Sequence, residues 1–358
     1  TAEAAAVLGI KVVFCDVDLH TFNTTADLIE PHINDKTKAI VPVHLYGQAC
    51  DMSSIINLAE KYKLKIIEDN AQAIGCKYTF PNEEIKFTGT MGNIGTTSFY
   101  PSKNLGCYGD GGAIFTNDNY LAEKIKMIVN HGEKIKYHHD IVGCNSRLDS
   151  IQAEILNIKL KYLDDYNSNR KIMANNYNLA FKDIQYIQIP KVILNSEHVF
   201  HQYTLRVLNG KRDDLKDYLN NMGVPTMIYY PIPIHKQRAY LSGQSLANTD
   251  ILSKEVISLP IHTELEASNQ DYIIHLAAYG SVMESLKNPE INFDINVKGT
   301  FNIRLRGYII PDTIQKELNA TKVYNSKAKV TISTETVSNI KDADNPIQNP
   351  TDDGRKRI

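Results

Sequence analysis

Lys103 is the residue whose type and surroundings point most directly to chemistry. It lies in segment 98–106, SFYPSKNLG, two residues after a proline and three before a glycine. An amine condenses with an aldehyde to form a Schiff base, provided that it is held neutral and aimed at the carbonyl carbon. Lysine loses its proton readily once partly buried, whereas arginine does not. Taken alone, a lysine in such a segment is typical of a solvated turn, so the prediction needs a second residue.

Asp69 supplies that second residue. It follows the apolar run 64–68, LKIIE, so we expect it at the carboxyl end of a strand, where open α/β sheets bind their ligands. Pyridoxal phosphate (PLP) is an aldehyde that proteins bind through lysine, and a carboxylate is wanted beside its ring nitrogen to keep that nitrogen protonated. A strand-end aspartate by itself is more often a cap. Together, Lys103 and Asp69 predict a PLP site.

Seven sequence blocks, in this order, resemble the DegT/DnrJ/EryC1/StrS family of PLP-dependent sugar aminotransferases over residues 1 to about 274. The blocks are 41–48 (VPVHLYGQ), 68–73 (EDNAQA), 98–106, 109–112 (GDGG), 130–132 (NHG), 145–149 (NSRLD) with Gln152 and Ala153, and 230–235 (YPIPIH). The resemblance implies an α/β protein of PLP-dependent transferase fold type I, similar to aspartate aminotransferase.

The resemblance also implies roles for five residues around the cofactor. Lys103 would form the Schiff base and carry the proton between the sugar carbon and the cofactor. Asp69 would pair with the pyridine nitrogen, and Gln72 would lie near the phenolic oxygen. Ser98 would bind the cofactor phosphate. Asn145 would reach the phosphate in the neighbouring subunit's site, because this family builds each site across a homodimer.

Three further residues lie in blocks that line the substrate side in this family: Arg147, Tyr230 and His235. Loop packing and hydrogen bonding explain them equally well. His201 and Gln202 could also face the substrate, although an alternating strand would place them there without any functional role.

The activity implied is amino transfer from a donor such as glutamate to a keto carbon of a nucleotide-linked deoxysugar. Such products serve deoxyaminosugar and cell-surface polysaccharide biosynthesis, including lipopolysaccharide. Lysine at position 103 favours transamination over the family's dehydratase branch, which has histidine at that position.

The composition is consistent with such an enzyme. The 358 residues are 42% hydrophobic, which is ample for a packed core in two or more domains. A net charge of −2 gives no electrostatic reason to expect nucleic acid or an anionic membrane as a partner. The five cysteines show no metal-ligand spacing and indicate reduced thiols in a cytoplasm. No apolar run approaches the length of a membrane span, and no signal peptide is visible.

Strand and helix signals alternate, as a doubly wound sheet requires. We predict strands at 10–15, 39–43, 65–68, 96–100 and 113–116. Helices are predicted at 25–33 and 52–62, in a segment that Asn117 or Asp118 caps and Gly132 ends, and in a long helix over 148–162. Residues 78–93 form a loop or hairpin. The apolar stripe of the long helix is interpreted as core or dimer interface.

The pattern changes after about residue 185. A strand over 199–207, a helix over 212–222 and a strand over 225–228 predict a smaller α+β domain. We therefore expect a large PLP-binding domain at 1–184 and a small C-terminal domain at 185–274.

The two ends depart from the family pattern. Residue 1 matches the middle of the family's large domain, so we expect this chain to lack the family's phosphate-binding turn and the aromatic ring that stacks on the cofactor. PLP affinity should then fall by orders of magnitude unless Lys103 holds it covalently.

Residues 271–303 resemble the stretch after the fourth strand of NAD-dependent nucleotide-sugar epimerases and dehydratases. With no G-x-x-G-x-x-G turn and no Tyr-x-x-x-Lys pair, no oxidoreductase site can be built. We expect an epimerase-like fragment at 275–303 and a flexible, unassigned tail at 304–358. These ends leave open two alternatives, a catalytically impaired mosaic or remnant that serves as a binding or assembly partner, and a regulatory protein on this fold.

Overall fold

The computed structural model describes residues 1–265 and 267–282. The chain separates into two units, residues 1–303 and residues 304–358. The predicted tail and most of the epimerase-like fragment lie outside the described residues. Within the described part, no helix is both long enough and apolar enough to cross a bilayer.

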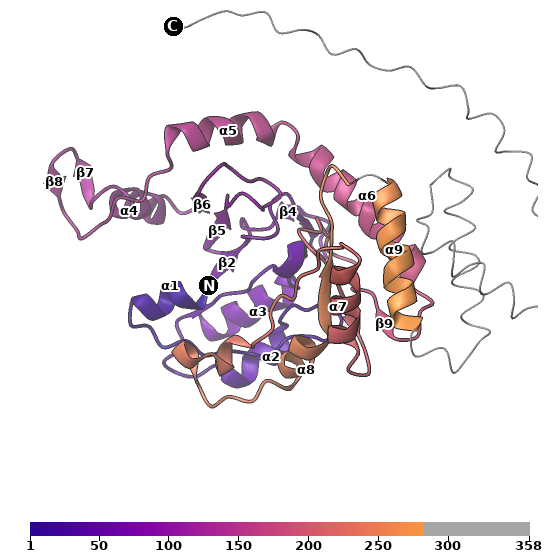
Figure 1. The fold of residues 1–358 in the computed structure, drawn as a ribbon. Coiled ribbons are helices and arrows are strands. Elements are labelled where there is room, and N and C mark those ends of the chain that lie inside the picture. Colours follow the sequence, from indigo (N-terminus) through magenta and orange to yellow (C-terminus); the bar gives the residue numbers. More distant parts are fainter. Residues whose placement is uncertain (266, 283–358) are drawn as a thin grey trace, which may run out of the picture. The chain divides into compact units, whose positions relative to one another are not determined.

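The first sheet carries the segments that lead into Asp69 and Lys103. Its strands run in the order β1-β2-β5-β6 and are β1 (Ala39–Ile40), β2 (Lys65–Asp69), β5 (Ile94–Ser98) and β6 (Gly112–Phe115). The first three are parallel and β6 is antiparallel (Figure 1). Because β2 and β5 are parallel neighbours, their carboxyl ends lie at the same edge of the sheet.

Helix α3 (Met52–Tyr62) covers this sheet and has the bounds that the sequence predicts. Its buried side chains Met52, Ile55 and Leu58 join Ile40 of β1 and Ile66 of β2 in one apolar core. The predicted helix at 25–33 is also present, as α2 (Ala26–Ile29) followed by a 3₁₀ turn (Glu30–His32) that contains Pro31.

The chain up to residue 160 contains further helices and hairpins. They are α1 (Ala2–Val7), the hairpin β3 (Lys77–Thr79) and β4 (Ile85–Phe87), α4 (Asn119–Ile128), the hairpin β7 (Glu133–Ile135) and β8 (His138–His139), and α5 (Ser150–Leu160). The β3–β4 hairpin confirms the prediction for 78–93. Asp118 caps α4 as predicted, because its Oδ1 accepts hydrogen bonds from the main-chain N–H groups of Tyr120 and Leu121.

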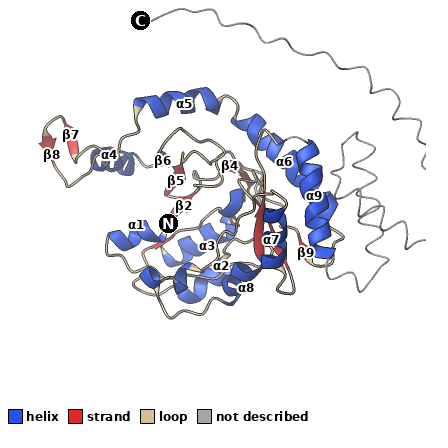
Figure 2. Cartoon of the chain, in the orientation of Figure 1, coloured by secondary structure: helices blue, strands red, loops and turns tan. Residues whose placement is uncertain are grey.

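A second sheet, entirely antiparallel, follows in the order β11-β10-β9. It contains β9 (Ile187–Gln188), β10 (Tyr203–Val207) and β11 (Val256–Leu259), with helices α6 (Leu163–Phe181), α7 (Arg212–Asn221), α8 (Ala247–Glu255) and α9 (Ala267–Val282) (Figure 2). Between α7 and α8 lie 3₁₀ turns at Ile234–Lys236 and Arg238–Tyr240. Side chains of α6, α7, α9 and the sheet form a second core around Tyr177, Phe181 and Tyr203.

Three predicted elements are wrong. Residues 10–15 form no strand, because the main-chain N–H and C=O of Phe14 bond to the side chain of Gln244 at 3.1 and 2.7 Å instead of to a neighbouring strand. The long helix over 148–162 ends at Leu160, and α6 starts at Leu163. The strand over 225–228 is reduced to a single bridge between Met227 and Ser258.

Candidate active site around Lys103

Asp69 ends β2, and its main chain is fixed on both sides. Its N–H donates to the carbonyl of Pro42 at 2.9 Å, and its carbonyl accepts from the N–H of His44 at 3.1 Å. In the side chain, Oδ1 accepts from the N–H of Ala71 at 3.1 Å, and Oδ2 accepts from the hydroxyl of Thr1. The carboxylate is therefore held at the edge of the sheet where β5 also ends.

Lys103 lies in the turn that follows β5, where its main-chain N–H donates to the carbonyl of Tyr100 at 2.9 Å. Its side chain is half-buried. Burial lowers the pKa of Lys103, and the negative charge of Asp69 opposes that shift. Lys103 and Asp69, which the sequence predicts to form one site, are thus close enough for the charge of Asp69 to influence Lys103.

Gln72 and Tyr230 lie beside this pair. Gln72 Oε1 accepts a hydrogen bond of 2.6 Å from the N–H of Tyr46. The pKa of Tyr230 is raised, chiefly by burial, and a hydrogen bond with Gln72 partly offsets this rise while the charge of Asp69 adds to it. The structure therefore brings Asp69, Gln72, Lys103 and Tyr230 into one neighbourhood.

A buried hydrogen-bond network around Glu68, the residue before Asp69, fixes the end of β2. Glu68 and His44 are both fully buried, and His44 Nε2 lies 2.9 Å from Glu68 Oε2. The Glu68 carboxylate also accepts from the N–H groups of Gly89, Met91 and Gly92 at 2.5–2.7 Å. Burial alone would raise the pKa of Glu68, but these hydrogen bonds outweigh it and the pKa is lowered. Glu68 is therefore ionised, and it anchors the strand end that carries Asp69.

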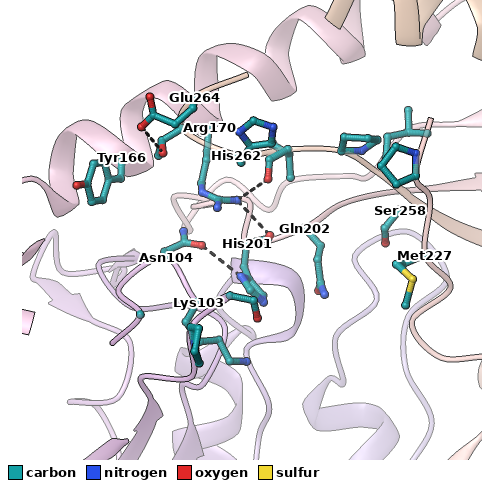
Figure 3. Close-up of a pocket in the computed structure, with 18 of the residues that line it drawn as sticks. Lys103, Asn104, Tyr166, Arg170, His201, Gln202, Met227, Ser258, His262 and Glu264 are labelled. Carbon is teal, nitrogen blue, oxygen red and sulfur yellow. Dashed lines mark hydrogen bonds between the residues drawn. The ribbon is translucent and has the colours of Figure 1, made fainter. Parts of the chain in front are cut away.

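A cavity of about 590 Å³ opens beside Lys103, between the lysine turn and the second sheet. Figure 3 shows Lys103, Asn104, His201, Arg170 and Gln202 around it. Its further lining comes from the chain around β11 and the loop after it, from Ser258 to Glu264.

Arg170, on α6, is a buried cation of this cavity, and no carboxylate within the described part of the chain pairs with it. One of its terminal nitrogens, NH1, donates to the carbonyls of Phe200, His201 and Ile261 at 3.0–3.2 Å. Burial lowers its pKa to about 10, so it stays charged near neutral pH. Arg170 thereby fixes the main chain of His201 against the loop after β11.

Of the four other residues predicted for the site, Ser98 lies near Lys103 in the chain and the other three do not. Ser98 ends β5 next to the lysine turn, and its Oγ accepts from the N–H of Tyr100 at 3.2 Å. Asn145 and Arg147 are exposed and bond to each other at 3.0 Å. His235 is buried, 3.4 Å from Asp250 Oδ1. Within one chain, the structure does not bring Asn145, Arg147 or His235 to Lys103.

Sequence reasoning missed Asn104, Arg170 and the pair His44 and Glu68. Asn104 could have been found because it follows Lys103 directly. Arg170 carries no sequence signal, since a charged residue within a long helix is normally read as solvent-exposed.

The residues present fit PLP as a ligand. An amine with a lowered pKa can form a Schiff base, and a carboxylate at a strand end can pair with a protonated ring nitrogen. The Gln72 amide, which hydrogen-bonds with Tyr230, adds a polar group to the same site.

Comparison with known proteins agrees with this chemistry. The model of the DegT/DnrJ/EryC1/StrS aminotransferase family matches residues 1–277. The UDP-2-acetamido-2-deoxy-3-oxo-D-glucuronate aminotransferase of Pseudomonas aeruginosa is 43% identical over 270 residues, which are 75% of this chain and 73% of that protein. The pleiotropic regulatory protein of Geobacillus stearothermophilus is 44% identical over 285 residues, 78% of this chain and 74% of that protein.

A solved structure shows the same fold. NtdA of Bacillus subtilis, with bound cofactor PMP, superposes with a TM-score of 0.71 at 32% identity and covers 78% of this chain and 65% of that one. The predicted fold type I is thereby confirmed. The chain belongs to the DegT/DnrJ/EryC1/StrS aminotransferase family, whose cofactor is PLP.

Proposed function

We propose that this protein is a nucleotide-sugar aminotransferase, which moves an amino group from an amino acid such as glutamate to the keto carbon of a nucleotide-linked deoxysugar. The observation that carries the proposal is the half-buried Lys103, whose pKa is lowered and which lies within the field of Asp69. The Pseudomonas aeruginosa relative, named for a UDP-linked 3-oxo sugar, supports the choice of substrate class. Cell-surface polysaccharide biosynthesis, including lipopolysaccharide, is a use that fits such a product.

When bound, PLP supplies the aldehyde and the electron-withdrawing ring that stabilises negative charge on the reacting carbon. The chain's own residues do the rest. Lys103 gives and takes the proton at the reacting carbon, and its lowered pKa makes that proton easier to release. Asp69 holds a proton on the ring nitrogen, and Gln72 orients the ring through its amide. Ser98 binds the phosphate.

We further propose a homodimer with shared sites, in which Asn145 acts in the partner's site and Arg147, Tyr230 and His235 contribute on the substrate side. The exposure of Asn145 and Arg147 supports this arrangement, because neither contacts Lys103 within the chain. We place the enzyme in the cytoplasm, where nucleotide sugars and glutamate are available.

The test is a comparison of the wild type with Lys103→Ala, with Lys36→Ala as a control at an exposed lysine. Each protein is mixed with PLP, and the visible absorbance of the Schiff base is recorded. Each is then supplied with glutamate and a UDP-linked 3-oxo sugar, and formation of 2-oxoglutarate is measured. We expect colour and turnover in the wild type and in Lys36→Ala, and a loss of at least about 10²-fold in turnover in Lys103→Ala.

Equal, weak and reversible colour in wild type and Lys103→Ala would contradict the proposal. A lysine-dependent colour without amino transfer would instead favour a catalytically impaired protein that acts as a binding partner.

A further inference from the structure

The side chain of Asn104, the neighbour of Lys103, makes three buried hydrogen bonds. Its Nδ2 donates to Asn167 Oδ1 at 2.8 Å and to the carbonyl of Val199 at 3.0 Å. Its Oδ1 lies 3.3 Å from His201 Nδ1. A main-chain carbonyl can only accept, so the amide nitrogen must face Val199 and the amide oxygen must face His201.

This orientation fixes the proton of the His201 ring. An amide oxygen can only accept a hydrogen bond, so His201 Nδ1 must carry a hydrogen. Burial, together with the positive charges of Lys103 and Arg170, lowers the pKa of His201 to about 3, so the ring is neutral at working pH. A neutral imidazole carries one proton, and Nε2 is therefore a bare acceptor.

The bare nitrogen belongs to a side chain that lines the cavity of Lys103. Among the described residues, none bonds to His201 Nε2, and Figure 3 shows His201 next to Lys103 with its bond to Asn104. The main chain of His201 cannot drift, because Arg170 holds its carbonyl at 3.2 Å. The other charged or titratable side chains that line this cavity are Lys159, Tyr166, Tyr229, His262 and Glu264.

We propose that His201 is a positioning residue for Lys103: when the lysine nitrogen is not bonded to a carbonyl carbon, rotation of the flexible lysine side chain brings that nitrogen to the open Nε2 of His201, which accepts a hydrogen bond from it. This rests on the proposed function of Lys103. During amino transfer the lysine is released and must stay aimed at the reacting carbon. An acceptor that never takes the proton itself can hold the lysine without competing for that proton.

Two substitutions separate the ring nitrogens. His201→Asn places an amide near the position of Nδ1 and keeps the bond to Asn104, but it removes the acceptor at Nε2. His201→Gln reaches the position of Nε2 and gives up the bond to Asn104. The pair therefore distinguishes an acceptor for Lys103 from a purely structural link to Asn104.

The main readout uses PLP-free protein. Lysines are labelled by reductive ¹³C-methylation, the Lys103 signal is assigned with Lys103→Arg, and its pKa is measured by NMR titration. An acceptor stabilises an ammonium more than an amine, so we expect His201→Asn to lower the pKa of Lys103 by about one unit. His201→Gln should leave it within a few tenths of the wild-type value.

Turnover gives the second readout. In the loaded enzyme we expect His201→Asn to lower kcat about tenfold with KM nearly unchanged, since one hydrogen bond to the lysine is lost, whereas His201→Gln retains most of kcat. Melting temperatures of both variants record any loss of folding.

A pKa of Lys103 that is unchanged in His201→Asn, or that shifts equally or further in His201→Gln, overturns the proposal. Because the titration needs no PLP, it can be read even if Lys103 gives no Schiff base, so failure of the proposed function and failure of this inference are distinguishable.

Discussion

At the scale of single residues, the site combines an amine whose charge is disfavoured with a carboxylate that opposes this effect. Burial lowers the pKa of Lys103, and Asp69 raises it. Without Asp69, burial would make the proton easier still to lose, and without burial the proton would be held more tightly. Together, these two effects leave Lys103 an amine that releases its proton more readily than an exposed lysine does.

Glu68 provides a prediction at this scale. Its folded-state pKa lies below the unfolded value, so its ionised form stabilises the fold above about pH 4.3, and this contribution is lost as the pH falls through the folded-state pKa. Glu68→Gln, which breaks the buried network with His44, should lower the free energy of unfolding by about 2–4 kcal/mol at pH 7. Urea unfolding between pH 3 and pH 8 should show the difference shrinking at the acid end.

Glu30→Gln is the matched control, since the Glu30 carboxylate lies at the surface, 2.6 Å from Lys61 Nζ. Its effect should be small at every pH. A Glu68→Gln effect that stayed constant down to pH 3 would mean that the loss does not come from the carboxylate charge.

The sequence allowed part of this residue-scale picture to be predicted. Lys103 and Asp69 were identifiable because each comes at or after the end of a predicted strand. The carboxyl ends of neighbouring parallel strands lie at the same edge of a sheet, so the two side chains were expected to be close. The role of Asn104 was not, because its three partners lie on α6 and in the chain before β10, 63 to 97 residues away. Such contacts are created by tertiary packing and leave no local pattern.

At the scale of elements, the loop 43–48 links the two sheets. His44 bonds to Asp69, the Tyr46 N–H bonds to Gln72, and the Gly47 carbonyl accepts from the N–H of Val199 at 2.9 Å. This loop therefore fixes the Asp69 side and the His201 side of the site relative to each other.

Gly47→Ala tests that link. Gly47 has φ of +104°, and an added Cβ would lie 2.9 Å from the N of His201 and 3.0 Å from the N of Phe200. We expect a loss of about 3 kcal/mol in the free energy of unfolding, from backbone strain and overpacking together. Lys103-dependent colour with PLP should also weaken, because the His201 segment is displaced.

Gly223→Ala is the control, because Gly223 has a similar φ of +81° with no atom within 4 Å of the added Cβ. It should cost only about 1–2 kcal/mol and leave the colour unchanged. Equal losses in the two variants, measured by urea unfolding, would show that the contact with His201 and Phe200 does not matter.

Elements whose apolar residues recur at a regular spacing were predicted well. Elements whose structure depends on contacts with distant parts of the chain were not. The bounds of α3 followed from its apolar face, but the apolar run 10–15 gave no hint that Gln244 would take the place of a neighbouring strand. The strand β11 was not predicted, because its four buried residues alternate in neither polarity nor size.

At the scale of the whole molecule, α5 leaves apolar side chains uncovered in a single chain. Ile151 is 74% exposed and Ile158 is 52% exposed, although the sequence pattern assigned this stripe to core or to a dimer interface. The exposure of these two side chains excludes them from the core of one chain and supports the proposed homodimer, whereas Leu148 of the same stripe packs against the core around Phe99 and Leu105.

Mixing two inactive variants tests whether sites are shared. Lys103→Ala lacks the amine, and Asn145→Ala lacks the amide proposed to act in the partner's site. If both groups serve the same site from different subunits, a mixed dimer contains one intact site. Co-refolded mixtures should therefore regain about a quarter of wild-type turnover, since half of the dimers are mixed and each has one working site.

Sedimentation of Ile151→Asp provides the companion measurement, because a charge on α5 should shift the protein toward monomer. Mixtures that regain no turnover while remaining dimeric would exclude a site shared between Lys103 and Asn145.

Helix α6 has a mechanical consequence for the enzyme's motions. Near its start, Asn167 bonds to Asn104 in the lysine turn and to the carbonyl of Ile74. One turn later, Arg170 donates hydrogen bonds to the carbonyl of Phe200, before β10, and to that of Ile261, after β11. The Tyr177 hydroxyl donates to the carbonyl of Pro260. Helix α6 is thus hydrogen-bonded both to the lysine turn and to the segments that flank the second sheet. A hinge rotation of the second sheet would have to displace the lysine turn or break the hydrogen bonds of Arg170. Opening and closing for substrates is therefore expected to come from loops at the rim of the cavity, with the two sheets moving as one body.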